Sequence, residues 1–168
     1  MVIPVLLTAL VAVLLVSDVS AYRSRRNRPV SQPIAFNHLK HTEELGLTCG
    51  MCHKYVETGR HAGLPEAETC AMCHSTKLGT SPEAAKVTEM LNNGDSIHFN
   101  KLFRLHDYVF YSHRRHVGIA GLECTNCHDG IANTVVPPKQ PLVKVDMAFC
   151  VDCHEARKVT TDCTACHR

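Results

Sequence analysis

The sequence predicts a small fold of short α-helices and irregular loops, with little or no β-structure, wrapped around bound groups rather than an apolar core. The chain has 168 residues, no Trp and only 5% aromatic residues, which is a small aromatic content from which to build a protein core. It also contains ten Cys and twelve His. Every Cys belongs to a C-x-x-C pair, and every pair is followed directly by His.

C-x-x-C-H is the attachment pattern of c-type haem. The two thiols add to the haem vinyl groups as thioethers, and the adjacent His supplies Nε2 to the iron as proximal ligand. Zinc ribbons, redox-active cysteine pairs and disulfides are the alternatives, but none of them needs a His directly after the second Cys. We therefore expect five haem c groups with iron, enclosed by residues 35–168 as one compact haem domain. The attaching residues are Cys49, Cys52 and His53; Cys70, Cys73 and His74; Cys124, Cys127 and His128; Cys150, Cys153 and His154; and Cys163, Cys166 and His167.

Residues 1–21 consist of an almost wholly apolar run, Met1 to Val16, then Ser17-Asp18 and Val19-Ser20-Ala21, and residues 22–35 form a basic linker. The run is either a cleaved signal peptide or a membrane anchor, and a buried core helix is a third interpretation. Four Arg follow the run, and the positive-inside rule would keep them in the cytoplasm. Haem attachment requires the rest of the chain to be outside, and the cysteine pattern is the stronger signal. We therefore expect an exported protein, periplasmic or otherwise extracytoplasmic, with residues 1–21 as a possible anchor.

An internal repeat divides the domain. The stretch from Phe36 to His41 and the stretch from Tyr111 to His116 both read aromatic-x-His-x-x-His, then seven residues, then C-x-x-C-H. The offset is 75 residues throughout. The repeat predicts a two-haem unit at residues 36–74 and a three-haem unit at residues 111–168.

The second axial ligands must come from the His that remain. Two His three residues apart on one turn face nearly the same way, so each pair can serve two neighbouring haems. His61 stands between Gly59 and Gly63, which allow a close backbone approach, and is the fifth candidate. His98 and His106 lack a motif context, and Met147 is the main competing ligand. The expected distal set is His38, His41, His61, His113 and His116.

Residues 75–110 should form a helical connector. Ser81 and Pro82 are typical of a helix start, and Asn92-Asn93-Gly94 of its end, so a helix should run from residue 82 to about residue 91. The Pro-rich residues 135–141 predict a surface loop. Side chains alone cannot build an adequate core around five haems at this size, so the haem-free chain should be largely unfolded.

The paired His before C-x-x-C-H resembles the class III multihaem cytochromes c. The stretch from Leu105 to His113, with five motifs and an apolar N-terminus, is also similar to the pentahaem subunit of alternative complex III. The resemblance implies that His38 serves the Cys49 haem and His113 the Cys124 haem, while His41 and His116 reach other haems. It also implies Pro where this chain has His106, which argues against His106 as a ligand.

Electron transfer is the predicted function, because six-coordinate haems leave no iron position for a substrate. The expected partners are redox proteins, among them a membrane quinol-oxidising or molybdenum/iron–sulfur complex. Haem propionates should make the holoprotein acidic, so nucleic acid is not an expected partner. A multihaem reductase of a small oxyanion would need a five-coordinate iron. A subunit of an extracellular cytochrome filament, using His98 or His106 between copies, is a third possibility.

Overall fold

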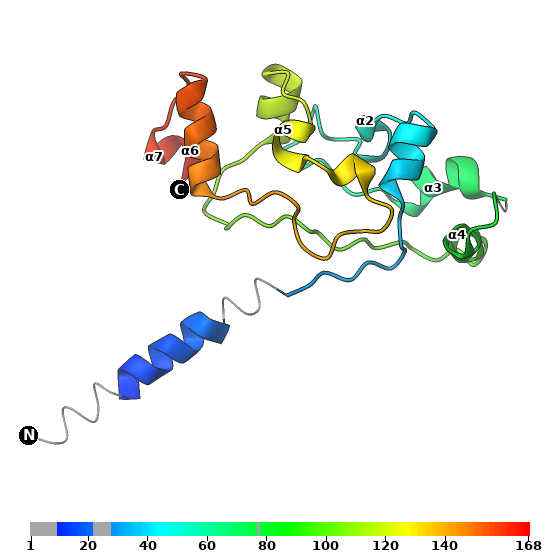
Figure 1. Ribbon diagram of the computed structural model, residues 1–168, viewed down its shortest axis with the longest axis horizontal. Coiled ribbons are helices and arrows are strands. Elements are labelled where there is room, and N and C mark those ends of the chain that lie inside the picture. The colour runs from blue at the N-terminus through cyan, green and yellow to red at the C-terminus, as the bar shows by residue number, and fades with distance from the viewer. Residues whose placement is uncertain (1–9, 22–27, 77) are drawn as a thin grey trace, which may run out of the picture.

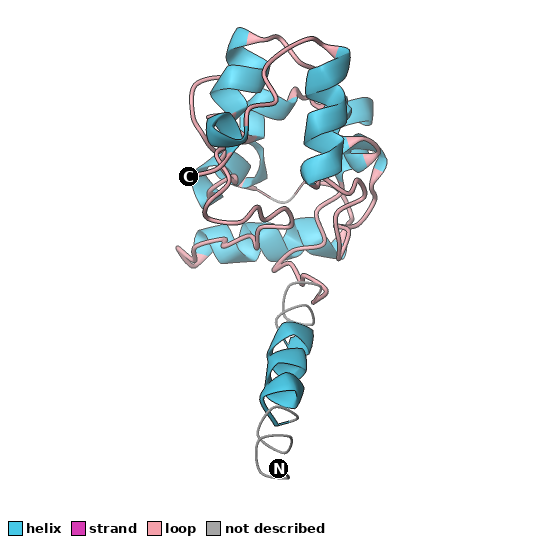
Figure 2. Ribbon diagram, turned by 90° about the vertical axis from the view of Figure 1, so that its left-hand side faces the viewer, coloured by secondary structure: helices cyan, strands magenta, loops and turns pink. Residues whose placement is uncertain are grey.

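The computed structural model describes residues 10–21, 28–76 and 78–168 (Figure 1). Within these ranges the chain consists of short helices and loops, as Figure 2 shows. The strand-type pairing found there is an isolated antiparallel bridge between Val109 and His167. The prediction of short helices and loops with little β-structure is therefore confirmed for the described residues. The elements are η1 (Lys40–Glu44), α2 (Cys49–Cys52), α3 (Ala67–His74), α4 (Pro82–Asn92), η2 (Arg114–Ile119), α5 (Thr125–His128), η3 (Ile131–Asn133), α6 (Met147–Ala156) and α7 (Cys163–Cys166).

The N-terminal region is described in part. Residues 10–21 are helical, whereas residues 1–9 of the expected signal or anchor and residues 22–27 of the expected linker lie outside the described residues. No helix in the described ranges is both long enough and apolar enough to cross a membrane. Residues 28–35 are extended and lie against the domain, since the Val30 amide donates to the Lys139 carbonyl at 2.8 Å.

Helix α4 forms where the sequence predicts it. Ser81 is its N-cap residue, with extended backbone and without a hydrogen bond from its side chain, and Pro82 occupies the first turn. At the other end the Asn93 amide donates to the Glu89 carbonyl, and Gly94 follows with a φ of 74°. That left-handed conformation stops the helix and suits glycine.

The apolar core is very small. Ile34, Val87 and Ile97 are the buried hydrophobic residues of the described chain, and no side chain in it is less than 2% exposed. They pack with neighbouring side chains of α3 and α4 at one end of the molecule. Cys70 of the second motif packs against this cluster, and the other four cysteine motifs lie outside it. The helices that carry them, α3, α2, α5, α6 and α7, are spread in that order along the long dimension in Figure 1.

Candidate functional site

Each C-x-x-C-H motif lies on or at the end of a short helix, and we number the five sites by motif order along the chain. The motif makes up most of α2, α5 and α7, whereas α3 ends at His74 and α6 continues two residues past His154. A helical turn brings two Cys that are three residues apart to the same face. All ten Cys lie in the described ranges, and none forms a disulfide. No group of three or more His, Cys, Asp or Glu side chains in the described chain is arranged to hold a metal ion by itself.

Two segments with the same local structure precede the first and third sites. We call residues 36–45 the first clamp and residues 111–120 the second clamp. In the first clamp the Phe36 ring stacks on His41, with centroids 4.4 Å apart and planes at 24°, and meets His38 edge-on at 4.8 Å and 83°. In the second clamp the Tyr111 ring stacks on His116 at 4.5 Å and 28°, and meets His113 edge-on at 4.9 Å and 85°.

The backbone of the two clamps repeats as closely as the rings. The hydrogen bond from the Leu45 amide to the Lys40 carbonyl has its counterpart from Ala120 to Arg115, both 3.1 Å long. Both bonds span five residues, the signature of the π-helical turns η1 and η2, which are rare and concentrate at functional sites. The predicted 75-residue repeat is therefore confirmed in local geometry.

Three ring pairs join a clamp His to a motif His. His41 lies 6.2 Å from His74 of the second site, measured between ring centroids. His113 lies 6.4 Å from His128 of the third site. His116 lies 6.1 Å from His154 of the fourth site. Each clamp therefore holds one His that faces a motif remote from it in sequence.

Burial sets the protonation state of these rings. Burial, and after it the nearby His53 and His41, lowers the pKa of His38 to about 4. Burial is also the first cause of the lowered pKa values of His74, His113 and His128. These imidazoles are neutral at neutral pH, which is the form that binds a metal ion.

Five of the ten motif thiols differ in pKa from typical zinc ligands and redox-active thiols. Burial is the first cause of a raised pKa in Cys52, Cys70, Cys124, Cys127 and Cys150. Reactive and metal-binding thiols have lowered pKa values instead.

Comparison with known proteins identifies the family. Residues 16–98 match the sequence model of the class III cytochrome C family, and residues 109–168 match that of cytochrome c7 and related cytochrome c. The chain is also 40% identical over 98 residues to the menaquinone reductase, multiheme cytochrome c subunit, of Nitratidesulfovibrio vulgaris. That similarity covers 58% of this chain and 45% of the relative, so it spans less than half of the relative's length.

The chain belongs to the multihaem cytochromes c. As a cytochrome of this kind it carries covalently bound haem c with iron, and it transfers electrons.

The residues present fit haem iron. A metal–imidazole bond of about 2 Å, with roughly 1.1 Å more from the nitrogen to the ring centre, puts two imidazoles on opposite sides of one ion about 6.2 Å apart. In each of the three His–His pairs of this cytochrome, the two ring centroids lie 6.1–6.4 Å apart. Few side chains around the motifs are buried. This is also consistent with bound haem, because the porphyrin would supply the missing core.

Hydrogen bonds orient the rings for ligation. In His41, His53, His113, His116 and His154, Nδ1 lies 2.7–3.1 Å from a backbone carbonyl oxygen. A carbonyl only accepts, so Nδ1 carries the proton and Nε2 is left with its lone pair for iron. His38 reaches the same state through a hydroxyl: Thr134 Oγ1 donates to the Ile131 carbonyl at 2.8 Å and lies 3.2 Å from His38 Nδ1.

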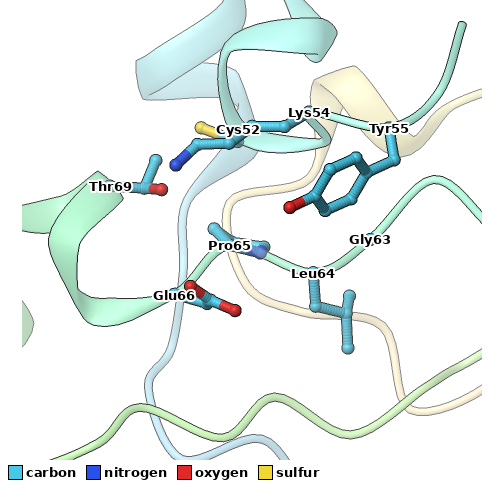
Figure 3. A pocket seen from close by; sticks show the side chains of 8 residues that line it. All are labelled: Cys52, Lys54, Tyr55, Gly63, Leu64, Pro65, Glu66 and Thr69. Atoms are coloured by element: carbon cyan, nitrogen blue, oxygen red, sulfur yellow. The ribbon is translucent and has the colours of Figure 1, made fainter. Parts of the chain in front are cut away.

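A small pocket of about 30 Å³ separates the first and second sites (Figure 3). In Figure 3 Thr69 and Tyr55 lie on opposite sides of it, with Cys52 above and Pro65 below. The volume suits about one or two water molecules and no larger ligand. The Oγ1 of Thr69 is buried without a hydrogen-bond partner. His74 Nδ1 is likewise buried without a partner, which distinguishes it from the rings above.

The remaining candidate ligands are placed differently. His61 is exposed on a loop next to Arg60, whose backbone carbonyl lies 3.1 Å from His113 Nδ1. His98 is exposed in an extended segment. His106 stacks on Tyr108 at 4.9 Å, and Tyr108 lies 5.8 Å from His167 of the fifth site. The Met147 side chain is 66% exposed at the start of α6.

Two acidic residues that position motifs were missed by the sequence analysis. Asp146 caps α6 by accepting a hydrogen bond from the Phe149 amide at 3.1 Å. Asp162 caps α7 by accepting from the Thr164 amide at 2.8 Å, and this bond is the first cause of its lowered pKa. An acidic residue one position before a helical turn was the available signal.

Proposed function

We propose that this cytochrome is an exported electron carrier that holds five haems, each ligated by two histidines. The observation that carries the proposal is the set of three His–His ring pairs at 6.1–6.4 Å, each joining a clamp to a motif. Two axial imidazoles close an iron to substrates and keep its potential low, which suits a carrier better than an enzyme.

The proposed ligand pairs follow the packing. His41 pairs with His74, His113 with His128, and His116 with His154, as their ring separations support. We pair His38 with His53, because at the 75-residue offset they are equivalent to His113 and His128, whose ring centroids lie 6.4 Å apart.

His61 is the proposed partner of His167 at the fifth site. Its neighbour Arg60 donates to the Val109 carbonyl at 3.2 Å, and Val109 forms the β-bridge with His167. The loop of His61 is thereby tied to the segment that carries the fifth proximal His.

A membrane complex that handles quinone is the proposed partner. The relative is a subunit of a menaquinone reductase, and its matched region covers 58% of this chain. We propose that this chain relays electrons between such a complex, quinol-oxidising or molybdenum/iron–sulfur, and other carriers outside the cytoplasm. Residues 1–21 would direct export and serve as signal peptide or anchor.

The haem count and spin state test the proposal directly. Mass spectrometry of the purified holoprotein should show five haem additions. Electron paramagnetic resonance (EPR) of the oxidised protein should show low-spin haems and no high-spin signal. A stoichiometric high-spin haem would instead favour a multihaem reductase with an open iron, and fewer than five haems would refute the count.

The fifth distal ligand is tested by paired variants. His61→Ala should convert one haem to high spin, whereas His106→Ala and Met147→Leu should leave the EPR spectrum unchanged. A new high-spin signal in His106→Ala, with none in His61→Ala, would move the ligand to His106.

A further inference from the structure

Each clamp contacts the repeat unit that contains the other clamp, and the two sets of contacts are equivalent. The Leu39 amide donates to the Thr134 carbonyl at 3.1 Å, and the Arg114 amide donates to the Gly59 carbonyl at 2.9 Å. Residues 39 and 114 are equivalent in the repeat, and so are residues 59 and 134. Each clamp therefore binds the loop that follows the other copy's first motif.

The first His of each clamp also contacts the opposite repeat unit through its ring Nδ1. His38 Nδ1 meets Thr134 Oγ1 of the second unit, and His113 Nδ1 meets the Arg60 carbonyl of the first. Reciprocal contacts between equivalent surfaces are the mark of a two-fold, isologous interface. In this chain the two surfaces belong to one polypeptide, so the repeat copies are related by an internal pseudo-two-fold axis.

The loops bound in this exchange follow the first and the third motif. The His113 ring, which faces His128 of the third site, has its Nδ1 3.1 Å from the Arg60 carbonyl, in the loop that follows the first motif. The first and third sites therefore adjoin at the axis, although the second motif separates them in sequence.

The other sites extend away from this junction. Each clamp joins its own site to one further site, because His41 pairs with His74 of the second and His116 with His154 of the fourth. Cys52 of the first site and Thr69, which precedes Cys70 of the second, line one small pocket, so these two sites adjoin.

The fifth site continues the series beyond the fourth. His154 Nδ1 of the fourth site lies 2.7 Å from the Thr160 carbonyl, in the loop that leads into α7 of the fifth site. In Figure 1, α6 and α7 lie together at the end opposite α3.

We propose that the five attachment sites form one row in the order second, first, third, fourth, fifth, with the Cys70 and Cys163 sites as its two ends. The inference rests on the proposed ligand pairs. It assigns exchange with outside partners to the haems at the two ends and leaves the first and third sites as the inner junction.

Distal-ligand variants test this order through redox interactions between neighbours. Met in place of His raises the potential of a haem, so that haem takes up its electron earlier and lowers the potentials of its neighbours. In EPR-monitored redox titrations of the holoprotein, His41→Met at the second site should lower the midpoint of the first-site haem alone. His38→Met at the first site should lower those of both the second and the third.

An equal shift of the third-site haem in His41→Met, or none in His38→Met, would overturn the order. Where a variant fails to mature, the five iron positions of the unmodified holoprotein, located by anomalous diffraction at the iron absorption edge, provide the same test. There the third iron should lie nearer to the first than to the second, and the reverse would overturn the row. The spin states in the EPR spectrum report the axial ligands independently of the order of the row. The proposed row can therefore be refuted without refuting the proposed electron carrier.

Discussion

Replacing Thr134 by valine should raise the midpoint potential of the haem that we propose His38 ligates, by about 20–65 mV. The Thr134 hydroxyl gives its proton to the Ile131 carbonyl at 2.8 Å, so toward His38 Nδ1 at 3.2 Å it can only accept. Valine keeps the shape of the side chain and removes the acceptor. The His38 ring then donates less electron density to iron, and the oxidised haem is the form that loses stability.

The magnitude follows from the strength of one hydrogen bond. Such a bond contributes about 0.5–1.5 kcal/mol, and a tenfold change in an equilibrium constant, about 1.4 kcal/mol, corresponds to about 59 mV for one electron. The 3.2 Å separation is long for a hydrogen bond, so the shift should fall in the lower half of that range.

Thr42 offers a matched control in the same place. Its hydroxyl donates to the His38 carbonyl at 2.9 Å and lies 3.1 Å from the Ala132 carbonyl, but it has no bond to the imidazole ring. An EPR-monitored redox titration should therefore show one haem shifted in Thr134→Val, no haem shifted in Thr42→Val, and the original potential restored in Thr134→Ser. Equal shifts in both valine variants would refute the reasoning, because the effect would then be structural.

Two further predictions concern stability. Gly118→Ala should destabilise the holoprotein by about 1–3 kcal/mol in thermal unfolding, since a Cβ at residue 118 would lie 2.1 Å from the Glu57 carbonyl oxygen. Ile119→Ala, at a 67% exposed side chain on the same turn, should have little effect, and a comparable loss there would contradict the steric explanation. The haem-free chain should show no cooperative transition by circular dichroism, because only three hydrophobic residues of the described chain are buried; a sharp transition would contradict this.

Local features were the ones that the sequence could predict. Pro82 and the residues after Leu91 set the limits of α4 through backbone chemistry alone, and the structure places the helix at Pro82–Asn92. The 75-residue repeat was visible because the same aromatic and histidine residues recur, and the ring geometry repeats with them. The residues that determine each of these features lie close together in the sequence. The sequence alone is therefore enough to predict them.

Long-range features could not be read in this way. The π-helical turns of the clamps depend on tertiary packing, since residue propensity does not select bonds that span five residues. The sequence identified His41 as a candidate ligand but not its partner, because His74 reaches it only through the packing of α3. The close approach of Gly118 to Glu57 also left no signal in a single sequence.

The fifth site breaks the symmetry that relates the other four, and this difference bears on function. It is held by the Val109–His167 bridge and by the Phe110 ring, which lies under both the Arg60 and the Arg168 guanidinium groups at 4.8 and 4.6 Å. The opposite end has no such arrangement in the described chain; there α3 packs on α4 instead. A symmetric four-site row would present the same surface to both partners. In the proposed row, adding one site at one end makes the two ends chemically distinct, as the proposed carrier between two different partners would require.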